Sequence, residues 1–265
     1  MLTSSQLTEF EKNGYLLIKN RRVCELKSSL SASLREIALV VLRRGGDSIL
    51  PSDINGMGFC ELVDYAHSIE KDVELTSAIY DLCKAHPSFM SLVNASYLLD
   101  TCKALGLGTP IASTIPLIRI DRPRQDKFLV PSHQDFWFSM LSKSAITFWF
   151  SLNDIDESHG PLLVFPGSHK LGITRMRRNN NENPFVTIDN YDEQYVEVLA
   201  APDEILVFSQ LLIHKSGANK SHQNRISVQV RYSDLDDVSQ LKSSFVVNNS
   251  PTTLELQKVH LQGTE

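Results

Sequence analysis

The sequence predicts one domain, residues 1–265, that is mainly β and has a helical N-terminal part. Apolar residues recur at helical spacing through most of residues 1–109. From about residue 110 to residue 235, short strand-like segments alternate with turn residues, which is typical of an antiparallel sandwich or barrel. Residues 236–265 form a polar tail of weak pattern, and neither a repeat nor a linker interrupts the chain.

Caps and breakers bound the helices expected in the N-terminal part. The first helix, residues 5–13, can be capped by Ser4 or Ser5 and ends at Gly14. A compact apolar strand is expected directly after it, at residues 15–18. Further helices are expected at 24–44, 70–86 and 88–105, with an irregular stretch at 47–60.

The second part of the chain reads as strands, one of which carries the apolar run Phe148-Trp149-Phe150. Residues 171–184 are too polar and too long for a hairpin turn, so we expect an exposed loop there that can act as a lid. The strands are expected at 112–120, 127–130, 134–138, 145–152, 161–165, 185–188, 194–199, 204–208 and 226–232.

Composition and charge are those of an ordinary soluble protein. A formal net charge of −5 gives no general attraction to nucleic acid or to an anionic membrane, so neither is expected as a partner. No apolar run is long enough to span a bilayer, and the first residues do not resemble a signal peptide. The four cysteines include no Cys-x-x-Cys pair and read as reduced and mostly buried, which favours a cytoplasmic location; a disulfide among them is the alternative.

One stretch carries a metal-binding pattern. His133 and Asp135 are separated by one residue, so on an extended strand both side chains point to the same face. An imidazole and a carboxylate on one face supply two of the three ligands of a 2-His-1-carboxylate site. The third ligand has to be a distant histidine, and His214 stands where an apolar run meets a turn. The alternative is a surface His–Asp pair without metal, and zinc would accept the same ligands as iron.

Together with its neighbours, this stretch resembles the phytanoyl-CoA dioxygenase family of Fe(II)- and 2-oxoglutarate-dependent oxygenases. The matching pieces are His133-Gln134-Asp135, the segment 160–170 (Gly-Pro-Leu-Leu-Val-Phe-Pro-Gly-Ser-His-Lys), and His214 followed by Arg225-Ile226-Ser227. Their order and spacing agree over roughly residues 110–235, with a weaker match at 10–15. The resemblance implies a double-stranded β-helix, that is, a jelly-roll or cupin-like catalytic core, buttressed on one face by the N-terminal helices.

The resemblance also implies roles for single residues. His133, Asp135 and His214 are expected to be the catalytic metal ligands. Arg225 would hold the far carboxylate of 2-oxoglutarate with its planar fork, and Ser227 would donate a second hydrogen bond to it. Trp149 would line the co-substrate pocket, although plain core packing explains it equally well. Gln134 is expected to support the motif, and His159 and His222 read as surface residues.

The implied activity is that of a hydroxylase, a dioxygenase that uses Fe(II), 2-oxoglutarate and O2 to oxidise an unactivated C–H bond of a small-molecule metabolite. Desaturation, ring formation and epoxidation stay open, whereas the carboxylate of Asp135 argues against halogenation. Two other classes are compatible with a metal-binding barrel: a cupin-type isomerase or epoxidase that does not use 2-oxoglutarate, and a non-catalytic binding barrel. Arg225 and Ser227 favour a dicarboxylate co-substrate over both. Three arginines at 175, 177 and 178 suggest an anionic substrate, and the sequence predicts neither its identity nor the oligomeric state.

Overall fold

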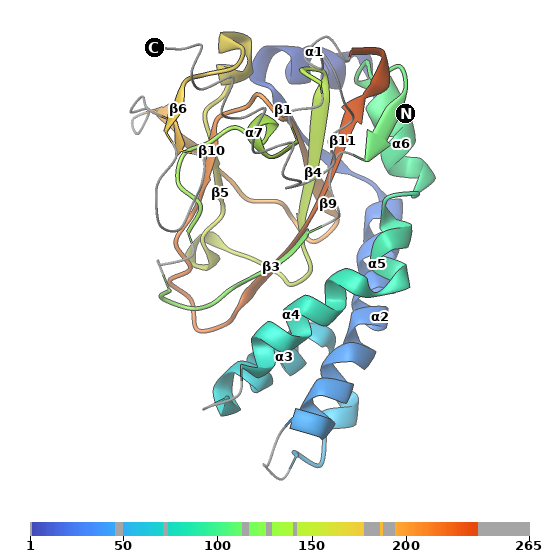
Figure 1. Ribbon diagram of the computed structural model, residues 1–265, viewed down its shortest axis with the longest axis vertical. Helices are drawn as coiled ribbons and strands as arrows, with labels where there is room; N and C mark the ends of the chain where they lie inside the picture. The colour runs from blue at the N-terminus through green and yellow to red at the C-terminus, as the bar shows by residue number, and fades with distance from the viewer. Residues whose placement is uncertain are drawn as a thin grey trace.

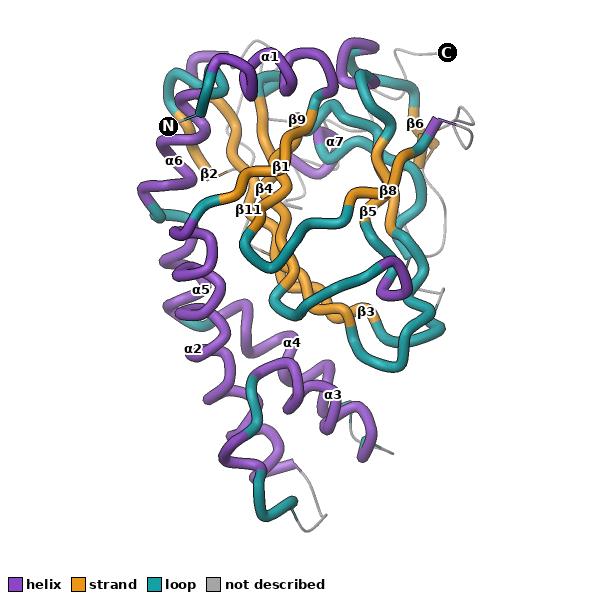
Figure 2. The backbone as a smooth tube through the Cα atoms, turned by 180° about the vertical axis from the view of Figure 1, so that it is seen from behind, coloured by secondary structure: helices purple, strands orange, loops and turns teal. Residues whose placement is uncertain are grey.

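Two antiparallel sheets face each other, and helices cover the outer side of the larger sheet (Figures 1 and 2). The computed structural model describes residues 2–45, 50–70, 74–112, 117–125, 129–139, 142–177, 186–187 and 194–237. Figure 2 shows the smaller sheet and the long helix α2 on opposite sides of the larger sheet. No helix among these residues combines the length and the apolar character that crossing a membrane requires. The cytoplasmic location stays a prediction.

The helices begin and end at residues with clear local causes. The first helix starts after Thr3, whose hydroxyl accepts from the Gln6 N–H in a capping box, so the predicted caps Ser4 and Ser5 are wrong. It ends at Gly14, whose φ of +79° closes the last turn. The helices are α1 Ser4–Asn13, α2 Arg21–Gly45, α3 Phe59–Ile69, α4 Leu75–Ala85, α5 Pro87–Leu92, α6 Ser96–Ala104 and α7 Phe136–Ser139.

Two predicted helices differ from the structure. The expected helix at 70–86 begins only at Leu75, and α3 precedes it where no helix was predicted. The expected helix at 88–105 is two helices, because the backbone of Ala95 is extended and caps α6. Pro87 starts α5, since its missing N–H is not needed in a first turn. All four cysteines are free thiols, and Cys83 and Cys102 are buried in the helical core.

The larger sheet has the order β1-β9-β4-β11-β2, with β3 also paired to β11, and the smaller sheet has the order β10-β5-β8. The strands of the larger sheet are β1 Tyr15–Lys19, β2 Pro110–Ala112, β3 Leu117–Asp121, β4 Ala145–Ser151, β9 Glu204–Ser209 and β11 Arg225–Asp234. The smaller sheet contains β5 Leu162–Val164, β8 Val196–Val198 and β10 His214–Ser216, and a separate pair joins β6 Met176–Arg177 to β7 Val186–Thr187.

Strand β11 is buried along its whole length, and its two faces differ in character. Ile226, Val228, Val230 and Tyr232 join the core that the larger sheet shares with the helices. The alternate residues point between the two sheets, into the barrel, as expected for a period of two. These are Arg225, Ser227, Gln229, Arg231 and Ser233, all polar and all buried. The interior of the barrel is therefore polar on this strand.

Two predicted strands are not strands. The segment 134–138 turns into α7 at Phe136, and His133 forms only an isolated bridge with His214. Residues 129–130 are irregular, and 127–128 lie outside the described residues. Within the predicted loop 171–184, residues 176–177 pair with β7, while 178–184 lie outside the described part of the chain, as does most of the predicted tail, 238–265.

Two glycines bring the end of β10 against the start of β5. Gly160 has φ +72°, and a Cβ at this position would lie 2.5 Å from the carbonyl oxygen of Gly217. The N–H of Gly217 in turn donates to the carbonyl of Pro161 at 3.1 Å. A side chain at residue 160 therefore meets backbone that cannot give way. This close approach sets how β10, the strand that begins with His214, lies against β5.

We predict that Gly160→Ala destabilises the protein more than Gly167→Ala does. Both glycines are in the left-handed αL region, with φ +72° and +79°, but a Cβ at Gly167 would make only an ordinary contact of 3.5 Å, with the carbonyl oxygen of Lys12, so this variant measures the backbone strain without a clash. The clash at Gly160 should lower the free energy of unfolding by a further amount of about 1–3 kcal/mol, as overpacking does. Urea unfolding of both variants measures the difference. Equal losses would show that the contact with Gly217 is not constraining.

Candidate metal centre

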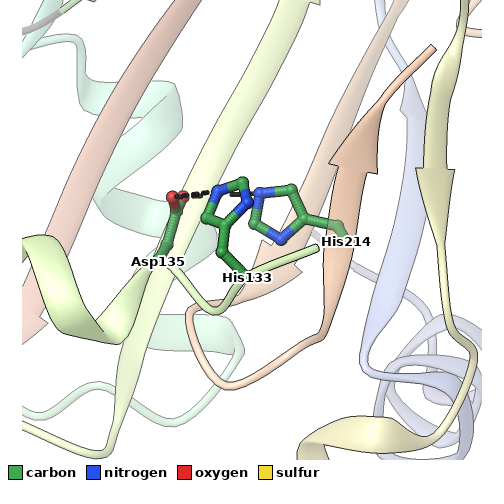
Figure 3. Close-up of side chains that lie close together, drawn as sticks. All are labelled: His133, Asp135 and His214. Carbon is green, nitrogen blue, oxygen red and sulfur yellow. Dashed lines mark ion pairs between the residues drawn. The ribbon is translucent and has the colours of Figure 1, made fainter. Parts of the chain in front are cut away.

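Three side chains from two distant segments meet between the sheets. His133 and Asp135 come from the turn before α7, and His214 is the first residue of β10. Two backbone hydrogen bonds of 3.0 Å join His133 and His214, each N–H donating to the carbonyl of the other residue. This bridge brings the imidazole rings together, with centroids 4.2 Å apart (Figure 3). The backbone pairing therefore brings the two histidines together, whereas Asp135, which was expected to share a strand face with His133, lies in the turn that leads into α7.

The atoms that can bind a metal face one another. Oδ1 of Asp135 lies 3.6 Å from Nε2 of His133 and 3.8 Å from Nε2 of His214 (Figure 3). One potential ligand atom from each residue lies within 4.8 Å of the others, and all three side chains are buried. Two nitrogens and one carboxylate oxygen at this separation can hold a divalent transition-metal ion.

Backbone carbonyls fix the tautomers of both histidines. Nδ1 of His133 lies 2.7 Å from the carbonyl oxygen of Pro131, and Nδ1 of His214 lies 3.0 Å from that of Leu212. A carbonyl only accepts, so each Nδ1 has to donate, which leaves a lone pair on each Nε2. Burial lowers the pKa of His214 to about 3, and the neighbouring His133 contributes in the same direction. His214 is therefore a neutral imidazole at physiological pH, the form that binds metals.

Asp135 is fully buried and is held by two further side chains. Arg231 donates to both carboxylate oxygens, from Nη2 to Oδ1 at 2.9 Å and from Nε to Oδ2 at 3.0 Å. Thr147 on β4 donates its hydroxyl to Oδ2 at 2.7 Å. Burial alone would raise the pKa of Asp135, but the charge of Arg231 and its hydrogen bonds hold this pKa well below its ordinary value. Asp135 is therefore ionised, as a metal ligand has to be.

Arg231 and Thr147 were missing from the sequence-based site. The alternation along β11 places Arg231 on the same strand face as Arg225, which could have indicated that it also points into the barrel. Sequence alone does not show which carboxylate it would meet.

Gln134, between the two ligands of the first segment, points away from them. Its Nε2 donates to the carbonyl oxygens of Gly172 and Leu211, and its Oε1 accepts from the N–H of Thr174. These three hydrogen bonds join the segments that carry His133 and His214 to the start of the polar loop. His159, expected at the surface, is instead buried beside Asp156, whereas His222 is exposed.

Arg225 and Ser227 lie next to each other on the inward face of β11. Nη2 and Nε of Arg225 both donate to Oδ2 of Asp121, at 2.8 and 3.3 Å, and Arg119 donates to Oδ1 at 2.7 Å. Burial would raise the pKa of Asp121, but these arginines lower it below its ordinary value. Two nitrogens of Arg225 are therefore already bonded within the protein, and its predicted role in holding 2-oxoglutarate stays a prediction. Among the described residues, nothing accepts from the buried Nη1 of Arg225 or bonds to the buried hydroxyl of Ser227.

Trp149 lies on β4 with its side chain in the cluster between the two sheets, with only 1% of its surface exposed. It pairs across the sheet with Gln229, two residues beyond Ser227. Its neighbours in the cluster include Leu162 and Leu206. The position is compatible with both expectations, lining a pocket and filling the core.

Comparison with known proteins gives one family and a common fold. The family model described as phytanoyl-CoA dioxygenase matches residues 10–227. A probable phytanoyl-CoA dioxygenase of Caenorhabditis elegans is 25% identical over 252 residues, covering 89% of this chain and 77% of that protein. Phytanoyl-CoA dioxygenase 1 of Oryza sativa is 23% identical over 269 residues, covering 94% of this chain and 95% of that protein.

Solved structures of similar fold have low sequence identity to this chain, so they bear on its fold alone. The α-ketoglutarate-dependent carbocyclase SnoK of nogalamycin biosynthesis is 19% identical, with a TM-score of 0.56 over 88% of this chain and 84% of its own. EvdO2 of Micromonospora carbonacea, solved with 2-oxoglutarate, is 17% identical with a TM-score of 0.54 over 90% and 95% of the two chains. The predicted jelly-roll core with buttressing helices is confirmed.

We predict that His133→Ala and His214→Ala each abolish tight binding of one divalent metal ion and leave the fold intact. For Asp135 the fair test is Asp135→Asn, because alanine would leave Arg231 buried without its partner at a cost of about 3–5 kcal/mol. Calorimetric titration with Mn(II) measures binding, and circular dichroism checks the fold. His222→Ala, an exposed histidine, is the matched control and should bind as the unaltered protein does. Unchanged affinity in any of the three variants would remove that residue from the centre.

Proposed function

The chain belongs to the phytanoyl-CoA dioxygenase family, and from this we propose that it is an Fe(II)- and 2-oxoglutarate-dependent dioxygenase that hydroxylates a small-molecule metabolite. The observation that carries the proposal is that one barrel contains both a potential metal-binding triad and an incompletely paired, buried guanidinium. His133, Asp135 and His214 would hold the iron. Arg225 and Ser227 would hold the co-substrate.

The donor set of the triad fits Fe(II). Two neutral imidazoles and one carboxylate are the ligands of non-haem iron oxygenases, which need further positions for a co-substrate and oxygen. The same three residues suit zinc, so the choice of iron depends on the family and on the co-substrate site. Among the structures of similar fold, SnoN is described in complex with Fe3+ and α-ketoglutarate, and EctD with bound Fe.

Two buried atoms that have no hydrogen-bond partner in the described part of the chain fit the far carboxylate of 2-oxoglutarate. Nη1 of Arg225 and Oγ of Ser227 are both buried, and both can donate to an anion. A buried donor without an acceptor costs about 1–3 kcal/mol, so a carboxylate that accepts from both would relieve two such costs. Asp121 holds the other nitrogens of Arg225 and thereby keeps the guanidinium fixed in one orientation. A bound carboxylate would therefore accept from Arg225 through Nη1 and not through two nitrogens of the guanidinium.

When bound, iron and 2-oxoglutarate supply the oxidising chemistry, in which O2 converts 2-oxoglutarate to succinate and CO2 and a C–H bond of the substrate is attacked. The chain's own residues bind and orient: the triad holds the metal, and Arg225 with Ser227 fixes the co-substrate. The carboxylate of Asp135 favours oxygenation over halogenation. Hydroxylation is the proposed outcome, and relatives of the same fold described as a carbocyclase and an epimerase mark the alternatives.

The decisive experiment is succinate formation from 2-oxoglutarate with Fe(II) and ascorbate, measured with and without candidate substrates. Stimulation by a substrate that gains one oxygen atom from labelled O2 supports hydroxylation. Turnover without oxygen gain would indicate ring formation, desaturation or epimerisation. Absence of any 2-oxoglutarate consumption by iron-loaded protein would contradict the proposal and favour a barrel enzyme that does not use this co-substrate, or a binding protein.

We predict that Arg225→Ala raises the 2-oxoglutarate concentration needed for half-maximal turnover at least about thirtyfold, since truncating one partner of a desolvated charged contact costs about 2–5 kcal/mol. Arg225→Lys should recover only part of the loss, because an ammonium group cannot both bond Asp121 and reproduce Nη1. Ser227→Ala should cost less, about 1 kcal/mol. Succinate release at fixed iron measures all three. An unaltered requirement in Arg225→Ala would direct attention to Arg119 or Arg122.

The arginines at 175, 177 and 178 support an anionic substrate only as a proposal. Arg175 is exposed, whereas the side chains of residues 177 and 178 lie outside the described part of the chain. We predict that replacing all three by alanine raises KM for a phosphorylated or nucleotide-linked substrate. Salt weakens the attraction between charges, with a screening length of about 10 Å at 0.1 M. The variant has lost that attraction, so its KM should depend less on salt. A matched variant lacking Arg21, Arg43 and Arg44 on α2 controls for net charge. Equal changes of KM and of its salt dependence in the two triple variants would show that the loop at 171–184 does not contribute to substrate binding.

A further inference from the structure

Two arginines on the inward face of β11 are each paired with a buried aspartate. Arg225 bonds Asp121, and Arg231 bonds Asp135. The proposed function uses Arg225 for the co-substrate and gives Arg231 no role. Arg231 nevertheless makes the closer approach to the metal centre, because its partner is one of the three proposed ligands. Arg231 can therefore affect how Asp135 binds a metal.

The two oxygens of Asp135 have different surroundings. Oδ2 accepts from Nε of Arg231 at 3.0 Å and from the hydroxyl of Thr147 at 2.7 Å, so two donors occupy its lone pairs. Among the described residues, Oδ1 has one hydrogen-bond donor, Nη2 of Arg231 at 2.9 Å, and it faces Nε2 of both histidines. Of the two oxygens, Oδ1 is therefore the one with a lone pair directed at the place where a metal would lie.

The guanidinium is itself fixed. Its Nη2 also donates to Oε1 of Gln229 at 2.6 Å, and its central carbon lies 5.6 Å from the ring centre of Phe138. The same ring contacts His133 edge-on, with centroids 5.6 Å apart. Arg231 is thus locked in orientation by residues on its own strand and on α7. If Arg231 only neutralised the charge of Asp135, the orientation of its guanidinium would not have to be fixed by these contacts.

We propose that Arg231, together with Thr147, is a positioning residue that restricts Asp135 to binding the metal through one oxygen, Oδ1. The inference rests on the proposed metal centre and deepens it. A carboxylate that bound through both oxygens would use a coordination position that the co-substrate and O2 need. By occupying Oδ2, Arg231 and Thr147 keep that position open. Partners of this kind, one shell removed from a metal, commonly change metal affinity by about 10–100-fold.

The test measures binding of Mn(II) and Co(II) in the absence of 2-oxoglutarate. Arg231→Gln should weaken binding about 10–100-fold. Arg231→Lys should also weaken it, because the lysine keeps the charge but cannot donate to both oxygens in one plane. The visible absorption of bound Co(II), which depends on the number and geometry of its ligand atoms, should change in both variants. Affinity and spectrum of Arg231→Lys equal to those of the unaltered protein would overturn the proposal, since charge alone would then suffice.

A second variant covers the case in which the Arg231 variants do not fold. Thr147→Val has nearly the same shape as threonine and removes only the hydroxyl that donates to Oδ2. It should weaken Mn(II) binding several-fold and shift the Co(II) spectrum in the same direction. If Thr147→Val binds metal as the unaltered protein does and the Arg231 variants are unfolded, the one-oxygen restriction is wrong and Arg231 serves stability.

Arg225→Lys is the matched control, because it changes an arginine of the same strand face that also pairs with a buried aspartate. It should leave metal affinity in the absence of 2-oxoglutarate unaltered and weaken 2-oxoglutarate binding at saturating metal. Arg231→Lys should instead weaken metal binding, and it should also weaken 2-oxoglutarate binding at saturating metal, because a released Oδ2 would take a coordination position that the co-substrate needs. Failure of the unaltered protein to bind metal would refute the proposed function itself. Metal binding that Arg231 and Thr147 variants leave unaltered would refute only the role of these two residues.

Discussion

The constraint on which this site depends is that β11 has no exposed face. Its apolar side packs against the helices, so its polar side has to find partners inside the barrel. Buried charges are tolerated when they are paired, and the barrel supplies Asp121 for Arg225 and Asp135 for Arg231. Where the pairing is incomplete, at Nη1 of Arg225 and at Ser227, the chain has capacity left for a ligand. The proposed co-substrate site is located by this incomplete pairing.

The cluster of His133, Asp135 and His214 could be predicted because few residue types bind metals, and the structure brings these three side chains together. The reason given for their convergence was incomplete, however. A strand was expected at 134–138, but the chain turns into α7, and the backbone bridge between His133 and His214 does the positioning. Pairing between residues so far apart in the chain depends on tertiary structure, which local patterns do not contain.

Partners across the barrel were the least predictable part of the site. Alternation along β11 indicates which residues share a face, but it does not show that Arg231 meets Asp135 or that Asp121 takes up two nitrogens of Arg225. The missed helix α3 has a simpler cause. Phe59, Leu62, Val63 and Ala66 follow helical spacing, but Gly56 and Gly58 just before them favoured an irregular reading.

The backbone bridge between His133 and His214 has a thermodynamic consequence. The two histidines come from segments that meet only when the barrel is closed, so an unfolded chain offers the metal no comparable set of ligands. By mass action, an ion at one hundred times its dissociation constant then adds about 2.7 kcal/mol to the stability of the folded state. Metal binding is therefore coupled to folding, and a chelator that removes the metal should lower the free energy of unfolding.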